Sequence, residues 1–404
     1  MRKESLGNVI PLVVWLCCIL LGAVRIRILL TQLPLNDFIT YWAAGHLFLN
    51  GSNPYFPDAL FALERAHGWP LPHPLVMLCP PWALPLAALL AAVPVHDARV
   101  VWLLISIALD VFSACGLWMY FGGGKRQLWI ALLVALTFLP MGSAEHLGQI
   151  TPIVLASITA FLLLQRSHRD FMAGAVLLGF GFKPHLLYLV WIALLLWVVQ
   201  TRRWKIIAGA AATYVLALSV AILYNRQALH YFGNTYGAAI NTVCGIGGAL
   251  RTAFGMQHVW LQYLPSVIGV LWLIGYWRRN RHAWSWRDHL PLLLIISLAS
   301  APYCWAHDFI LIMPALIYLA ARQAYRYILV LISYAAVQLL LASVWFTVWA
   351  GILNNLWILF YWFANSRISS AGTKTPAPTG TSEDAYPLPV FAYAPPVINR
   401  DFQQ

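Results

Sequence analysis

The sequence predicts an all-α membrane protein that crosses the bilayer many times. Hydrophobic residues make up 61% of its 404 residues and charged residues only 9%, unlike the balance of a soluble domain. The mean hydropathy is +0.72, and apolar segments alternate with short basic clusters along most of the chain. We therefore expect one membrane domain over residues 1–365.

The basic clusters lie between apolar segments, so the formal net charge of +12 indicates membrane orientation and not a nucleic-acid partner. Placing the clusters in the cytoplasm predicts about twelve crossings with both termini inside. The crossings are expected at 9–30, 100–120, 128–143, 150–165, 171–182, 185–200, 206–224, 260–277, 290–301, 309–321, 327–343 and 344–363.

Residues 31–98 are expected to form a large first outer loop with interfacial helices. The segment 75–93 is apolar enough to cross, but Pro80, Pro81 and Pro85 interrupt it. A full crossing there would also move five basic clusters outside, against the positive-inside tendency. We therefore expect 75–93 to lie in the outer interface.

The two ends of the chain are expected in the cytoplasm. A cleaved signal peptide competes with a first membrane helix at 9–30, but no small-residue cleavage site follows, and Arg25 and Arg27 interrupt the apolar run. Residues 366–404 are rich in Ser, Thr, Pro, Gly and Ala, which predicts a disordered tail.

The six cysteines show no Cys-x-x-Cys pairing, which favours buried thiols over a metal site. Cys79, Cys244 and Cys304 fall on the predicted outer side. A disulfide among them stays open, because spacing in the sequence does not settle pairing.

The longest polar and aromatic stretch runs from Asp37 to Tyr55, directly after the first predicted crossing. Asp37 opens an amphipathic helix in which Tyr41 and Phe48 lie at helical spacing, and turn residues from Asn50 onward end it. A lone carboxylate is thereby held at a membrane surface.

Other polar residues interrupt the apolar pattern on the same predicted face, which indicates one shared cavity. Lys183 stands before Pro184 between two short apolar segments, so we expect its ammonium to bind an anion and not merely to reach the interface. Arg25 and Arg27 lie at the outer end of the first helix, where phosphate binding competes with interfacial snorkelling.

Two further short polar segments within the apolar pattern, here called polar islands, lie at the starts of predicted helices. Glu145, His146 and Gln149 precede one helix, and Gln149 is a candidate for binding a sugar hydroxyl. His307 and Asp308 precede another, where His307 can donate to an anion or orient a sugar and helix capping suffices for Asp308.

No metal or nucleotide site is predicted. His73, His146, His185 and His307 lack the tight spacing of metal ligands, and no phosphate-binding glycine loop is present. Asp110, in the middle of a predicted crossing, is interpreted as a packing residue.

Four motifs, in order, carry a resemblance to a known family. They are Asp37-Phe38-x-x-Tyr41-x-Ala43-Ala44 leading to Gly51-x-x-Pro54-Tyr55, Gly148-Gln149, Lys183-Pro184, and Ser300-x-Pro302-x-x-Trp305-x-His307. Over residues 9–360 the chain resembles glycosyltransferase family 87, which includes polyprenyl-phosphate-mannose-dependent mannosyltransferases. The resemblance implies a C-type glycosyltransferase fold.

The resemblance also implies that the donor is a sugar on polyprenyl phosphate and that Asp37 is the base. The chemistry agrees, since an attacking hydroxyl must lose a proton and a departing phosphate needs cationic stabilisation. The expected roles are catalysis by Asp37, donor-phosphate binding by Lys183, Arg25, Arg27 and His307, and sugar or acceptor binding by Tyr41, Gln149, His146 and Trp305. Asp58 is the nearest alternative base.

The predicted protein is thus a hexosyltransferase of the cytoplasmic membrane with its site on the outer face. It is expected to move a hexose, mannose favoured, to a lipid or glycan acceptor with inversion, among membrane lipids and without a cofactor or divalent metal. A lipid or solute transporter is the alternative, with Asp110, Arg25 and Lys183 as coupling charges. Transporter sites usually lie near the bilayer midplane, whereas these polar groups gather at one surface.

Overall fold

The computed structural model describes residues 33–233, 235, 244–326, 328–344 and 350–372, with scattered residues between 16 and 31. Within these ranges every regular element is helical and there is no strand, in agreement with the predicted class. In chain order the elements are α2 (Phe38–Leu49), α3 (Pro57–Ala66), η1 (Pro81–Ala83), α4 (Leu84–Ala91), α5 (Val95–Tyr120), η2 (Lys125–Gln127), α6 (Leu128–Thr137), α7 (Leu139–Leu147), α8 (Thr151–Arg166), α9 (Asp170–Ala175), η3 (Val176–Phe182), α10 (Tyr188–Thr201), α11 (Trp204–Tyr224), α12 (Ala228–Gly233), α14 (Gly245–Phe254), α15 (Trp260–Asn280), η4 (Arg281–Ala283), α16 (Trp286–Ala299), η5 (Ala306–Ile312), α17 (Met313–Ala321), η6 (Ala324–Arg326), α18 (Ile328–Val344), α19 (Ala350–Leu353) and α20 (Leu356–Gly372).

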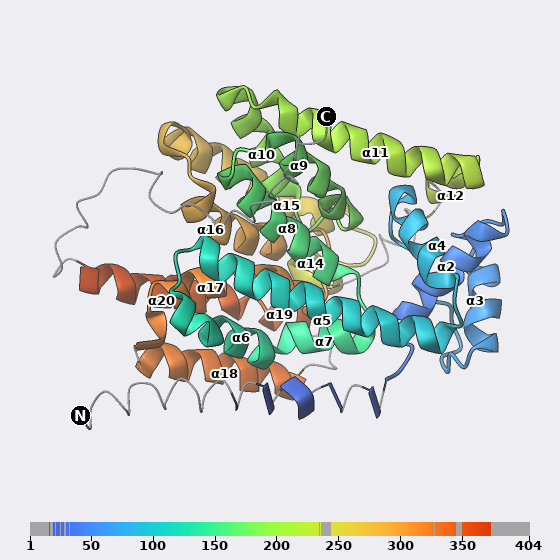
Figure 1. The fold of residues 1–404 in the computed structure, drawn as a ribbon, viewed down its shortest axis with the longest axis horizontal. Coiled ribbons are helices and arrows are strands. Elements are labelled where there is room, and N and C mark those ends of the chain that lie inside the picture. The colour runs from blue at the N-terminus through green and yellow to red at the C-terminus, as the bar shows by residue number, and fades with distance from the viewer. Residues whose placement is uncertain are drawn as a thin grey trace, which may run out of the picture.

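The helix α5 runs through the molecule from the end where α2, α3 and α4 lie together (Figure 1). Pro94 precedes it, where a missing backbone N–H costs nothing, and three glycines follow Phe121 at its other end. The indole rings of Trp102 and Trp118 are buried against neighbouring helices. With 26 residues, α5 is about 39 Å long and connects the two ends of the fold.

Apolar helices with exposed aliphatic side chains indicate a membrane protein. Among the described residues, α5 and α11 are each long and apolar enough to cross a bilayer. A third candidate combines residues Lys125–Thr137 with α7, which meet at a bend of 59°. On α11 the side chains of Val215, Leu216 and Leu223 are exposed, as lipid contact requires.

Several predicted crossings are broken into shorter pieces. The segment predicted at 171–182 is α9 followed by the 3-10 helix η3, and the one at 309–321 begins in η5 and continues as α17. Gly174 and Gly209 let α9 and α11 touch through their backbones, since a Cβ on either glycine would lie 1.9 Å from a carbonyl oxygen of the other helix. Although α9 is short, it is thus held against α11 by close backbone packing.

The segment 75–93 contains a short helical unit, Pro81–Ala91, which packs on α2. Such a unit rises only about 16 Å, well short of a bilayer core. Gly45 makes the close packing possible, because a Cβ there would lie 2.0 Å from Ala87 O. At the other end of the chain, α20 continues to Gly372, past residue 365, where the tail was expected to begin.

Candidate active site

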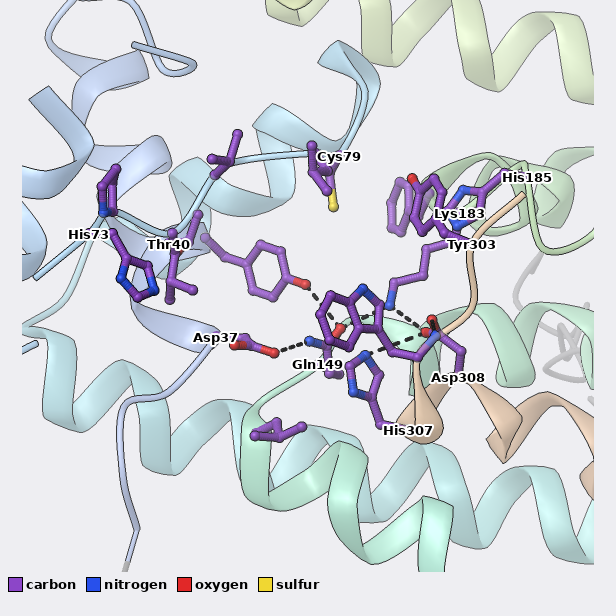
Figure 2. A pocket seen from close by; sticks show the side chains of 18 residues that line it. Asp37, Thr40, His73, Cys79, Gln149, Lys183, His185, Tyr303, His307 and Asp308 are labelled. Carbon is purple, nitrogen blue, oxygen red and sulfur yellow. Dashed lines mark hydrogen bonds and ion pairs between the residues drawn. The ribbon is translucent and has the colours of Figure 1, made fainter. Parts of the chain in front are cut away.

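A cavity of about 610 Å³ collects most of the predicted polar residues (Figure 2). Its walls come from the first loop, from the segments before α8 and α10, and from the segment between α16 and α17. The lining residues are Asp37, Thr40, Tyr41, His73, Pro74, Leu75, Val76, Leu78, Cys79, Leu147, Gln149, Phe182, Lys183, His185, Tyr303, Trp305, His307 and Asp308.

Asp37 occupies the N-cap position of α2 but makes no capping hydrogen bond. Its Oδ2 instead accepts a short hydrogen bond from the Gln149 side-chain amide. Burial raises the pKa of Asp37 above its usual range, and the Gln149 hydrogen bond and the nearby Lys183 charge oppose that rise. A carboxylate with a raised pKa is a stronger base than an exposed one.

Gln149 lies between α7 and α8 and is 5% exposed. Gly148 makes the turn, because it ends α7 with a left-handed φ of 72°, and a Cβ at this position would lie only 2.6 Å from Phe38 Cβ. While its amide nitrogen binds Asp37, Gln149 Oε1 accepts from Lys183 Nζ at 2.9 Å and from Tyr41 OH at 3.2 Å. One amide therefore links the Asp37 carboxylate to the Lys183 ammonium.

Lys183 also forms a buried ion pair. Its Nζ lies 2.6 Å from Asp308 Oδ1, and the side chains are 12% and 1% exposed. Burial alone would raise the pKa of Asp308, but the charge of Lys183 is the main cause that brings it down to about 2. The hydroxyl of Thr151 donates to the same oxygen at 3.2 Å.

Asp308 also shapes the segment that carries the aromatic wall of the cavity. Its Oδ2 accepts from the backbone N–H of Trp305 at 3.0 Å, which is the capping role predicted for it. His307 Nε2 lies 3.6 Å from Oδ1. Because burial lowers the pKa of His307 to about 4, its imidazole is neutral at pH 7 and can donate only one ring N–H.

Arg99, near the start of α5, is a residue that sequence reasoning misses. The side chain is buried, and its Nε donates to Pro34 O at 3.1 Å while Nη2 donates to Glu145 O at 2.7 Å and His146 O at 2.9 Å. These carbonyls precede Asp37 and Gln149 in the chain. One guanidinium thus ties together the two segments that meet at the Asp37–Gln149 bond.

Glu64 on α3 is a second residue that the sequence does not single out. It is fully buried, and its two oxygens accept from Thr40 Oγ1 at 2.9 Å and from Leu75 N at 3.0 Å. Thr40 and Leu75 both line the cavity. A carboxylate in an amphipathic helix usually faces water, so the sequence pattern does not predict its burial.

The structure brings together six of the nine predicted site residues, namely Asp37, Tyr41, Gln149, Lys183, Trp305 and His307. His146 is not among the lining residues, and only its backbone carbonyl takes part, as an acceptor for Arg99 and Asn36. Arg27 is exposed, and Arg25 lies outside the described residues. The roles assigned to all nine stay predictions.

In the part of the chain that the structure describes, no three His, Cys, Asp or Glu side chains are grouped as ligands for a metal ion. Among the lining residues, Asp37 accepts a hydrogen bond from Gln149, and Lys183 and Asp308 form an ion pair. The expectation that no metal is needed stays a prediction.

The fold and the cavity define a helical membrane protein with a buried network of acid, amide and ammonium groups, suited to handling a polar group beside lipid. The sequence model of glycosyltransferase family 87 matches residues 78–302, more than half of the chain. The chain therefore belongs to glycosyltransferase family 87, as its motifs predicted. No curated protein and no solved structure matches it. Family membership implies transferase chemistry with a sugar donor and an acceptor, which leaves the transporter alternative without support.

Proposed function

We propose that the protein is a polytopic hexosyltransferase with a C-type glycosyltransferase fold and about twelve crossings. It takes a hexose, mannose favoured, from a polyprenyl-phosphate-linked donor and passes it to a lipid or glycan acceptor on the outer face of the cytoplasmic membrane. The observation that carries the proposal is the chain of hydrogen bonds from Asp37 through Gln149 to Lys183 along one cavity.

The proposed reaction is a single displacement with inversion. The acceptor hydroxyl gives its proton to Asp37 as its oxygen attacks the anomeric carbon, and the bond from that carbon to the phosphate oxygen breaks with its electron pair on the phosphate. Within the described residues only Gln149 bonds the Asp37 carboxylate, so Oδ1 is left to accept the proton. The raised pKa of Asp37 suits this role.

The departing phosphate would be stabilised by donors at the other end of the network. Lys183 has three N–H groups and uses two on Gln149 and Asp308, which leaves one for a phosphate oxygen. Since Asp308 already balances its charge, Lys183 would act mainly as a preorganised hydrogen-bond donor. Neutral His307 lies beside it as a second donor.

Apolar side chains in the same cavity suit a lipid-linked substrate. Leu75, Val76, Leu78 and Phe182 face the space that Asp37 and Lys183 reach. A sugar attached to an isoprenoid phosphate combines a polar head with an apolar chain, whereas a nucleotide sugar would place two phosphates and a base against these walls. This composition supports the donor class.

The test is sugar transfer by purified, monodisperse Asp37→Asn and Asp58→Asn. Asparagine keeps the shape of aspartate but loses its basicity, so Asp37→Asn should bind donor and lose about a hundred- to ten-thousand-fold in turnover. Asp58 is exposed in the first turn of α3 and serves as the matched control. Transfer of radiolabelled sugar from polyprenyl phosphate to membrane acceptors gives the rate. Near-normal turnover by Asp37→Asn would contradict the proposal, and inactivity of Asp58→Asn alone would move the base there.

A further inference from the structure

A second polar cavity, of about 280 Å³, lies at the far end of α5 from the proposed active site. It is lined by Phe121, Arg287, Asp288, Tyr318 and Arg322. Trp102, which donates to Gly148 O beside the first cavity, is separated from Phe121 by about 28 Å of helix. That distance is close to the thickness of a bilayer core, so the two cavities lie near opposite membrane surfaces.

Two guanidinium groups line this cavity with most of their donors available. Arg287 Nη2 donates to Phe121 O at 2.8 Å, and Arg322 Nη1 donates to Tyr318 OH at 3.0 Å and to Asn365 Oδ1 at 3.4 Å. A guanidinium carries five N–H groups, so within the described chain each arginine keeps at least three for a ligand. The bonds to Phe121 and Tyr318 fix the positions from which the remaining donors act.

The charge of the cavity favours an anion. Asp288 is its only acidic lining residue, and within the described chain it forms no ion pair with either arginine. It stands in the first turn of α16, where a carboxylate is stabilised by the helix dipole. Two arginines against one aspartate leave a net positive charge, and guanidinium groups bind phosphate oxygens in pairs.

The surroundings indicate that the anion belongs to a lipid. Asn365, which Arg322 contacts, lies on α20, and the side chains of Trp362 and Leu359 on the preceding turns are 72% and 63% exposed. Exposed Trp is typical of the zone where lipid headgroups meet acyl chains. The basic clusters predict that this end faces the cytoplasm, and basic pockets there suit anionic headgroups.

We propose that the cavity between α5, α16 and α17 binds the phosphodiester headgroup of an anionic glycerophospholipid, with its acyl chains along the exposed face of α20. The phosphate takes the free N–H groups of Arg287 and Arg322, and Tyr318 borders it. The site is separate from the proposed active site and independent of the sugar that is transferred.

The test compares lipid binding by the full-length protein in detergent, measured by native mass spectrometry and thermal unfolding. Phosphatidylglycerol is the probe, phosphatidylcholine with the same chains is the neutral comparison, and inorganic phosphate alone tests a free ion. Arg287→Gln and Arg322→Gln keep a donor for the fold but lose the charge, and each should weaken phosphatidylglycerol binding about fivefold. Arg279→Gln, exposed in the last turn of α15 and outside the cavity, is the matched control and should bind as wild type does.

Arg322→Lys provides an independent arm, because it keeps the charge but loses the paired donors of the guanidinium. It should bind phosphatidylglycerol more tightly than Arg322→Gln and less tightly than wild type. Equal phosphatidylglycerol binding by wild type and both Gln variants would overturn the proposal. An equal loss of binding in Arg279→Gln would show that phosphatidylglycerol binds a diffuse basic surface and not this cavity. If inorganic phosphate stabilised the protein as much as the lipid does, the ligand would be a free phosphate and not a lipid headgroup. Since none of these arginines lines the first cavity, sugar transfer in detergent should be unchanged.

Discussion

Lys183 Nζ lies 2.6 Å from Asp308 Oδ1, and this contact joins residues that are 125 positions apart in the chain. Both side chains are largely removed from water, so each charge depends on the other for its solvation. The pair holds the segment before α10 against the segment before α17. It therefore fixes the width of the cavity as well as its charge.

Breaking this pair should cost more stability than replacing it. Asp308→Leu leaves a buried ammonium without its partner and should lower the free energy of unfolding by about 3 kcal/mol, whereas Lys183→Met with Asp308→Leu should recover most of that loss. Thermal unfolding of the purified variants measures the order. The double variant should still fail in sugar transfer, since it lacks the phosphate donor. A double variant less stable than Asp308→Leu would contradict this account.

Removing the Gln149 amide should shift the pH dependence of transfer. Its hydrogen bond favours the ionised form of Asp37 and lowers the pKa of that carboxyl, so Gln149→Leu should raise the pKa further. A base must be deprotonated to act, and the acidic limb of kcat/KM therefore moves to higher pH. Profiles between pH 4 and 8 measure the shift, with Asp58→Asn as the control. An unmoved or downward-shifted limb would exclude Asp37 as the titrating base.

Arg99 should act as a positioning residue for the same bond. Arg99 donates to Pro34 O from Nε and to His146 O from Nη2, whereas lysine has one nitrogen that cannot occupy both positions. Arg99→Lys should therefore loosen the two segments and reduce kcat by about a hundredfold, the cost of a misplacement of about 1 Å. Arg99→Lys should also move the acidic limb of the kcat/KM profile to higher pH, as Gln149→Leu does. Arg126→Lys, at an exposed position, is the control. A lower melting temperature with an unchanged pH profile would mean that Arg99 is merely structural.

The contact between α9 and α11 should be intolerant of one methyl group. In Gly209→Ala the new Cβ would lie 1.9 Å from Phe171 O, which forces the helices apart and should cost about 1 to 3 kcal/mol of stability. Gly275→Ala is the matched control, because no atom of another helix lies within 4 Å of its Cβ position. Thermal unfolding should separate the two variants clearly. Equal melting temperatures would show that α9 and α11 do not pack as described.

Composition and the order of motifs were sufficient to predict the helical class and the family, and the polar islands supplied six of the residues that now line the cavity. What they did not predict is how the charges pair. Asp308 was assigned only a capping role because a local hydrogen bond explained it, yet a lone buried ammonium at Lys183 needed a counter-charge from some distant segment.

The other misses share a physical reason. Arg99 uses backbone carbonyls, and the sequence pattern carries no record of which carbonyls are left without partners at the end of α7. The predicted crossings at 171–182 and 309–321 contain 3-10 helices, in which hydrogen bonds join residues three apart with poorer geometry than in an α-helix. Hydropathy does not distinguish the two helix types, so the sequence pattern does not predict these segments. His146 lies next to the site as its position in the sequence predicts, but its backbone carbonyl, and not its ring, takes part in the hydrogen bonds there.

The long separation between Lys183 and Asp308 has a consequence for biosynthesis. At about 5 to 20 residues per second, a ribosome needs roughly 6 to 25 s to extend the chain from one residue to the other. During that interval the ammonium is in a partly inserted chain without its carboxylate, so water, a lipid phosphate or the insertion machinery must solvate it. A nascent chain released before Asp308 would keep the Lys183 ammonium without this partner, at the energetic cost of an unpaired buried charge.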